Sequence, residues 1–155
     1  VELARSGCTV DITAFPVEEG EDAWSAADAL SRYLASGAPP DRVTVSSDAG
    51  GCLPCFDADG RVTHMDVGAA GALLETLAEL VAGGLPLATV LPAFTFNPAR
   101  LLRLAGKGCI ETGADADLVA LDATGAADTV IIRGSVHVRG RVAVRRGTFE
   151  NPEER

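Results

Sequence analysis

One aspartate directly follows a short apolar segment and is the residue of this chain best placed for chemistry. Residues 42–47 read RVTVSS, which is typical of a strand, and Asp48 comes next. In α/β folds, ligands and catalytic groups gather at the carboxyl ends of parallel strands. A carboxylate there can hold a metal ion or accept a proton from a water nucleophile. The structural alternative is that Asp48 caps the turn that follows the strand.

The cysteines and histidines give weaker signals. Cys52 and Cys55 have the spacing of a redox pair or of half a zinc knuckle, but a structural zinc needs four ligands and no second pair exists. His64 and His137 are predicted to be ordinary loop or surface side chains. Without any sign of export, the thiols are expected to be reduced and unpaired. The four cysteines are Cys8, Cys52, Cys55 and Cys109.

The first third of the sequence predicts the order strand, helix, strand. Residues 8–15 are β-branched and residues 22–36 have helical periodicity, ahead of the second strand at 42–47. The apolar residues of the helix recur at steps of three and four, namely Trp24, Ala27, Leu30 and Leu34. This order indicates a parallel pair joined by a crossover helix, the repeating unit of α/β folds.

The rest of the chain divides into a helical and a β-rich part. We expect a small hairpin within residues 49–67, helices at 70–81 and 85–94, and another that begins at Asn97-Pro98, with Asn97 as its N-cap. After Gly106, three segments are strand-like, and Arg139-Gly140 is the predicted turn of a hairpin. The sequence therefore predicts a boundary near residue 105, between parts 1–105 and 106–155.

Charge and hydropathy narrow the classes of partner. The net charge of -9 disfavours nucleic acid and anionic membranes, because affinity for polyanions comes largely from Lys and Arg. No apolar run reaches the length of a membrane span, so we expect a cytoplasmic protein. Asp115 and Asp117 have too few neighbouring oxygens for calcium and are predicted to fix a tight turn, with Lys107 as another turn residue.

Taken together, these segments resemble the C-terminal part of an amidohydrolase-superfamily enzyme, most closely the isoaspartyl (β-aspartyl) dipeptidases. The matching segments are residues 9–13 (TVDIT), 42–48 (RVTVSSD), 56–60 (FDADG), 73–76 (LLET), 106–108 (GKG), 113–118 (GADADL) and 145–150 (RRGTFE). The resemblance implies an α/β fold that consists of the last two βα units of a metal-dependent-hydrolase (β/α)8 barrel, followed by C-terminal strands of a small β-sandwich.

The resemblance also implies roles for individual residues. Asp48 matches the aspartate that binds zinc and accepts the proton of the attacking water. Gly50, Gly51 and Cys52 match the loop that binds the substrate's terminal carboxylate, although the family has a serine where this chain has Cys52. A thiol is the weaker hydrogen-bond donor, so binding through that side chain is in doubt.

The family site holds two zinc ions, and its remaining ligands, which come from earlier barrel strands, are absent from this chain. We therefore expect the chain to be inactive alone and to need the missing N-terminal part of the barrel as its partner, with a small dipeptide as substrate and a homo-oligomer as the complete form. Two alternatives stay open. One is a non-catalytic remnant that serves binding or oligomerisation, and the other is an amidohydrolase for N-acyl amino acids or cyclic amides.

Overall fold

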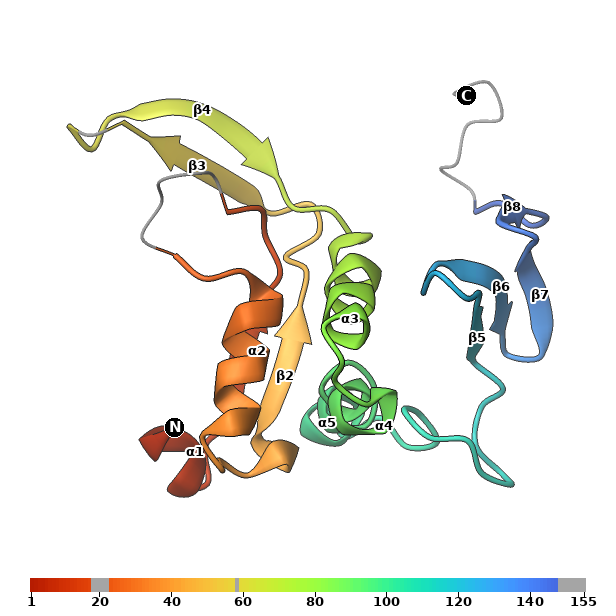
Figure 1. The fold of residues 1–155 in the computed structure, drawn as a ribbon. Coiled ribbons are helices and arrows are strands. Elements are labelled where there is room, and N and C mark those ends of the chain that lie inside the picture. Colours follow the sequence, from red (N-terminus) through yellow and green to blue (C-terminus); the bar gives the residue numbers. More distant parts are fainter. Residues whose placement is uncertain (18–22, 58, 148–155) are drawn as a thin grey trace.

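A pair of short parallel strands carries the candidate site. The computed structural model describes residues 1–17, 23–57 and 59–147. After a single helical turn, α1 (Glu2–Arg5), strand β1 (Val10–Thr13) pairs in parallel with β2 (Val43–Ser46), in a register that runs from Val10 opposite Val43 to Thr13 opposite Ser46. Helix α2 (Ala26–Ala35) and a short turn, η1 (Pro40–Arg42), connect them (Figure 1). The predicted strand–helix–strand order is confirmed.

Helix α2 begins later than its periodicity predicts. The Ser25 side chain accepts the N–H of Asp28 at 3.1 Å, and this cap starts the helix at Ala26. Trp24 lies outside the helix and is 62% exposed, with the Arg32 guanidinium 4.4 Å from its ring centre. The prediction that Trp24 belongs to the buried stripe is therefore wrong, and the predicted first residue, Asp22, lies outside the described residues.

The core lies between β2 and the helices that cover one face of the strand pair. Val43 and Val45 of β2 are buried, and Leu30 of α2 is fully buried against them. Helix α3 (Ala72–Ala82) closes the core with Leu77 and Leu80. Because side chains alternate across a strand, Thr44 and Ser46 must face the opposite side, away from this core.

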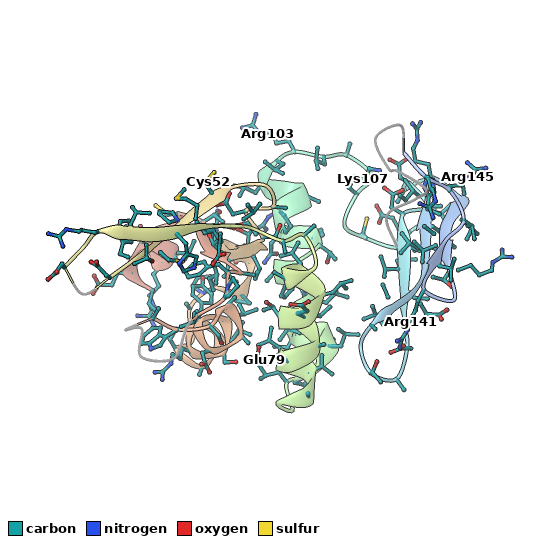
Figure 2. The ribbon with its side chains drawn as sticks, turned by 90° about the horizontal axis from the view of Figure 1, so that it is seen from above. Cys52, Glu79, Arg103, Lys107, Arg141 and Arg145 are labelled. Atoms are coloured by element: carbon teal, nitrogen blue, oxygen red, sulfur yellow. The ribbon has the colours of Figure 1, made fainter. Side chains whose placement is uncertain are left out.

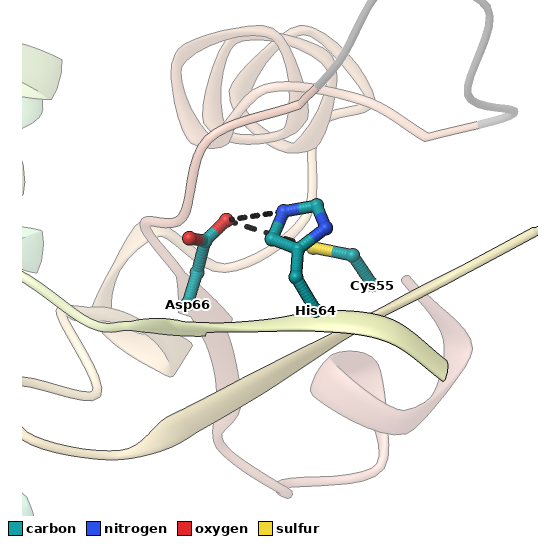
Figure 3. Close-up of side chains that lie close together, drawn as sticks. All are labelled: Cys55, His64 and Asp66. Atoms are coloured by element: carbon teal, nitrogen blue, oxygen red, sulfur yellow. Dashed lines mark hydrogen bonds and ion pairs between the residues drawn. The ribbon is translucent and has the colours of Figure 1, made fainter.

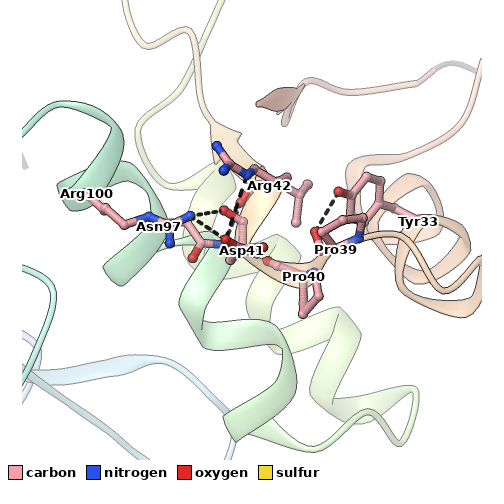
Figure 4. A network of polar contacts seen from close by, with 8 residues as sticks. Tyr33, Pro39, Pro40, Asp41, Arg42, Asn97 and Arg100 are labelled. Atoms are coloured by element: carbon pink, nitrogen blue, oxygen red, sulfur yellow. Dashed lines mark hydrogen bonds and ion pairs between the residues drawn. The ribbon is translucent and has the colours of Figure 1, made fainter. Parts of the chain in front are cut away.

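Three short helices follow α3: α4 (Leu87–Val90), η2 (Leu91–Ala93) and α5 (Phe96–Leu101). The prediction that Asn97 caps the last of them is wrong, because Thr95 is its N-cap and Asn97 is buried inside the first turn. The Asn97 amide donates to the carbonyls of Pro40 and Val43, both at 2.8 Å (Figure 4). Since this one buried side chain bonds to carbonyls of two other segments, its tertiary hydrogen bonds account for the position of Asn97.

A hairpin and a separate antiparallel sheet complete the fold. Strands β3 (Cys52–Phe56) and β4 (Val62–Val67) form the predicted hairpin directly after Asp48. The sheet, in the order of the chain, contains β5 (Leu118–Leu121), β6 (Ala127–Ile132), β7 (Ser135–Arg139) and β8 (Val142–Ala143). Gly140 and Arg141 form the turn between β7 and β8, one residue beyond the predicted turn at Arg139-Gly140.

Among the described residues, packing against the core and against α3 connects this sheet with the helical part. Leu121 of β5 packs against the core, and Gly125 lies against Ala78 of α3, which stands between the strand pair and the sheet (Figure 1). Among the helices of the described residues, none combines the length and the apolar character needed to cross a lipid bilayer.

Lys107 links the connecting segment to the sheet (Figure 2). Its ammonium contacts Asp115 at 2.8 Å and also bonds to Asp117, whose other oxygen accepts the backbone N–H of Arg133 at 2.7 Å. Asp117 thus joins segments 16 residues apart instead of only fixing the local turn that was predicted. Hydrogen bonds to Asp115 and Asp117 raise the pKa of Lys107. Hydrogen bonds from Lys107 and from the Arg133 backbone lower the pKa of Asp117.

We expect Asp117→Asn to lower the melting temperature at neutral pH, with a difference from the unmodified chain that narrows in acid. A carboxylate whose folded pKa is lowered stabilises the fold above its unfolded pKa, and this contribution is lost as the pH falls through the folded value. Thermal unfolding followed by circular dichroism between pH 7 and pH 3 measures the difference. Glu79→Gln, at an exposed carboxylate of α3, is the control; an Asp117→Asn effect that does not change with pH would contradict the assignment.

Candidate functional site

Asp48, two residues after the end of β2, has a backbone conformation that is uncommon for a residue other than glycine. Its φ is +46°, in the left-handed region. The turn that follows is closed by the main chain, because the Gly51 N–H donates to the Asp48 carbonyl at 2.8 Å. The Asp48 carboxylate is exposed and makes no hydrogen bond or ion pair with any residue that the structure describes. The capping role considered as the structural alternative is therefore not seen here.

Two glycines enclose Asp48. A Cβ atom at Gly51 would lie 2.4 Å from a carboxylate oxygen of Asp48, and one at Gly68 would lie 2.1 Å from the Asp48 carbonyl oxygen. Both distances are far inside van der Waals contact: Gly68 requires the absence of a side chain because it meets backbone atoms, whereas a side chain at Gly51 would displace the Asp48 carboxylate. Backbone bonds from Gly50 N–H to Gly68 O, at 2.9 Å, and from Gly68 N–H to Gly51 O, at 3.0 Å, tie the two segments together.

The structure places Gly50, Gly51 and Cys52 on one turn beside Asp48. The N–H groups of Gly50 and Gly51 already donate to the carbonyls of Gly68 and Asp48, so neither is available to a ligand in this arrangement. Cys52 begins β3 with an exposed side chain. The two glycines thus shape the loop through their backbone, whereas Cys52 presents a side chain to its surroundings.

A second polar group, which the sequence interpretation missed, lies on the same strands. The hydroxyls of Thr44 and Ser46 donate to the two carboxylate oxygens of Asp11, at 2.6 and 2.5 Å. Asp11 lies on β1 directly opposite Thr44, and Asp48 is two residues beyond Ser46. The alternation of polar and apolar residues in β2 was the signal that could have identified this polar face.

The hairpin brings together a third group, Cys55, His64 and Asp66 (Figure 3). Cys55 pairs with His64 across the two strands, and Asp66 lies two residues further on the same face as His64. In contrast, Cys52 and Cys55 are three residues apart on one strand and so point to opposite faces. All four cysteines belong to the described residues, and none of them forms a disulfide. His137 lies apart from this group, on β7.

One carboxylate alone is a poor metal site, because a catalytic zinc is held by three protein ligands. The exposed and unpartnered Asp48 carboxylate fits the role of a single ligand, but among the described residues it belongs to no group of three potential metal ligands. If a metal binds at Asp48, the remaining ligands must come from outside the described chain. What Asp48 can do with its own atoms is accept a proton or contribute one oxygen to a cation.

Comparisons with known proteins show which family and which solved structures this chain is similar to. A family model described as "Amidohydrolase family" matches residues 20–139. Two structures of a β-aspartyl dipeptidase from Fervidobacterium islandicum AW-1, one in complex with the dipeptide β-Asp-Leu, are similar over 96% of this chain. The complex has 36% identity and a TM-score of 0.82, and the other structure has 33% identity and a TM-score of 0.75.

A more distant structure extends the comparison. The N-acetyl-D-glucosamine-6-phosphate deacetylase of Mycobacterium smegmatis is 26% identical over 84% of this chain, with a TM-score of 0.59. Against all three structures the chain spans only a part of the other protein: 38% and 36% of the two dipeptidase chains and 38% of the deacetylase chain.

Proposed function

Because this chain belongs to the amidohydrolase family, we propose that it is the C-terminal part of a zinc-dependent enzyme that hydrolyses the β-aspartyl peptide bond of dipeptides. The family assignment confirms the resemblance found in the sequence. One observation carries the narrower proposal: 36% identity and a TM-score of 0.82 to a β-aspartyl dipeptidase over 96% of this chain.

In this proposal, β1 and β2 are the last two strands of a (β/α)8 barrel. A barrel of this kind takes about 250 residues, so earlier strands must be supplied by the missing N-terminal part. The polar face formed by Asp11, Thr44 and Ser46 supports the proposal, because it lies opposite the helix-covered core, where a barrel interior would be. Residues 106–155 form the second part, which contributes strands to a small β-sandwich, and the complete enzyme is a homo-oligomer.

Asp48 is the residue of this chain that takes part in the reaction. Its carboxylate would be one ligand of the metal centre and the acceptor of a proton from the attacking water. When bound, zinc would polarise the scissile carbonyl and make a water molecule acidic enough to act near neutral pH. Asp48 would then deliver the same proton to the leaving amine, so that the carboxylate ends the reaction in the charged form in which it began.

The geometry around Asp48 supports this role. Its carboxylate is exposed and bonded to no described residue, so no hydrogen bond has to be broken before the group accepts a proton or a cation. Gly51 leaves space under the carboxylate, and the Gly68 backbone fixes the position of the Asp48 carbonyl. Gly50, Gly51 and Cys52 would form the side of the loop that faces the substrate. The two glycines would set the path of the backbone, and the Cys52 side chain would contact the substrate.

A direct assay tests the proposal. The 155-residue chain and the longest natural polypeptide that contains it would be loaded with zinc and given β-Asp-Leu. We expect hydrolysis by the longer protein and none by the chain alone, because one carboxylate cannot assemble a two-zinc centre. Turnover by the 155-residue chain alone would refute the incomplete-site argument, and an inactive longer protein would favour a non-catalytic remnant used for binding or oligomerisation.

The second candidate function keeps the fold and changes the substrate. The 26% identity to a deacetylase of an N-acetylated sugar phosphate favours hydrolysis of an N-acyl group. An N-acyl amino acid and a cyclic amide belong in the same assay as β-Asp-Leu. A higher kcat/KM on either of them than on the dipeptide would select this alternative.

A further inference from the structure

Apart from the proposed catalytic residues, the face of the β3–β4 hairpin contains a compact set of three metal-binding groups. We propose that Cys55, His64 and Asp66 bind a divalent zinc ion, at a site that is separate from Asp48. The thiol sulfur, a ring nitrogen and a carboxylate oxygen of these residues all lie within 4.8 Å of one another. Among the described residues, this is the one such group of three.

Both distances from Asp66 to the other two groups match those of a tetrahedral zinc site. Cys55 Sγ lies 3.5 Å from Asp66 Oδ2, and His64 Nε2 lies 3.4 Å from the same oxygen (Figure 3). Zinc–sulfur bonds of about 2.3 Å and zinc–nitrogen or zinc–oxygen bonds of about 2.0 Å at tetrahedral angles require separations of about 3.5 Å and about 3.3 Å. The Asp66 carboxylate therefore already lies from Cys55 and His64 at the distances that a shared zinc would impose, and the third pair of ligand atoms lies within 4.8 Å.

The hydrogen bonds of Thr63 orient His64 for this role. The Thr63 hydroxyl donates to the Cys55 carbonyl at 3.1 Å and also lies 3.1 Å from His64 Nδ1, from which its oxygen can accept a hydrogen bond. In the tautomer with the ring proton on Nδ1, Nδ1 donates to Thr63 and the lone pair of Nε2 points toward Asp66, as metal binding requires. A zinc-binding histidine commonly makes such a bond through its second nitrogen.

His64 and Asp66 face each other closely enough to share a proton or a metal ion. Nε2 of His64 and Oδ2 of Asp66 are 3.4 Å apart, so either a ring proton on Nε2 or a shared metal ion can join them. The donor set of sulfur, nitrogen and oxygen suits zinc, whereas calcium and magnesium take oxygen ligands. On binding, Cys55 would release its thiol proton to solvent, and water would occupy the fourth position.

The hairpin begins and ends beside Asp48. Cys52, at the start of β3, follows Gly51, and Val67, at the end of β4, precedes Gly68, the two glycines that enclose Asp48. A zinc that clamps the two strands would therefore stabilise the frame of the Asp48 turn while leaving its carboxylate unbound. This role does not depend on the proposed dipeptidase activity.

Zinc titration of the 155-residue chain, in competition with a chromophoric chelator, tests the proposal. We expect one zinc per chain, and a dissociation constant at least about 100-fold higher in Cys55→Ser or His64→Ala, because even the loss of a supporting hydrogen bond costs about 10- to 100-fold in metal affinity. Asp66→Asn and Thr63→Val should each weaken binding at least about tenfold. With Co²⁺ in place of zinc, thiolate-to-cobalt absorption should be present in the unmodified chain and absent in Cys55→Ser.

Two control variants make the result specific. Cys52→Ser changes an exposed thiol on the opposite face of the same strand, and Asp48→Asn changes the proposed catalytic carboxylate; both should bind zinc as tightly as the unmodified chain. Circular dichroism should show that all variants fold alike, as expected for exposed or half-buried hairpin residues. Zinc affinity unaffected by Cys55→Ser, or weakened only by Asp48→Asn, would overturn the proposal, as would a chain that binds no zinc.

Discussion

Asp48→Asn, made in the longer active protein, is expected to lower kcat/KM for β-Asp-Leu about 1,000-fold or more. An amide has nearly the shape of a carboxylate but cannot accept the proton of the attacking water, and positioned acid–base groups contribute about 10²- to 10⁴-fold. The exposed Asp48 carboxylate has no bond to a described residue, so the change should leave the turn intact. Steady-state kinetics with zinc in excess measures the loss.

Two further measurements separate the roles of Asp48. If it is the proton acceptor, the acid limb of the pH profile of kcat/KM should disappear in the variant, whereas loss of a metal ligand alone should lower the zinc content without removing that limb. Asp28→Asn, at an exposed carboxylate in the first turn of α2, is the matched control and should retain activity. A variant Asp48→Asn that retains more than about a tenth of the kcat/KM would remove Asp48 from the mechanism.

The strand–helix–strand unit could be predicted from the sequence because its signals are local. Residues 43–46 alternate apolar and polar side chains, most of them β-branched, and Gly and Pro end the neighbouring helix, so these local patterns locate β2 and place Asp48 just after its end. The antiparallel strands after residue 117 were predicted for the same reason. Here local preference and tertiary packing agree.

The features that were missed depend on partners far away in the sequence. Asn97 has the side chain of an N-cap, yet it is buried and does not cap the helix. Its amide instead donates to carbonyls of η1 and β2, which lie 57 and 54 residues earlier in the sequence. Cys55 and His64 meet only because the register of the hairpin sets them opposite each other. A one-residue shift in that register would have separated them, and register cannot be read from composition.

Gly68→Ala is expected to abolish most of the activity of the longer protein through a change that touches no reacting atom. The added methyl would lie 2.1 Å from the carbonyl oxygen and 2.7 Å from the carbonyl carbon of Asp48, and backbone atoms cannot turn aside as a side chain can. The turn must therefore shift by about 1 Å or more, and a misplacement of this size costs about 100-fold in rate.

The matched control is Gly71→Ala, three residues further along. Gly71 has helical dihedral angles, φ −62° and ψ −26°, and a methyl there would meet only the end of the Glu75 side chain, at 3.7 Å. It should leave the activity unchanged, and the narrower backbone freedom of alanine should stabilise the fold slightly. Asp48 remains chemically intact in Gly68→Ala. Lost activity in that variant, together with retained activity in Gly71→Ala, would therefore show that the rate depends on where the Asp48 carboxylate lies. Equal activity of the two variants would mean that the turn adapts and that the close packing of Gly68 against Asp48 has no part in catalysis.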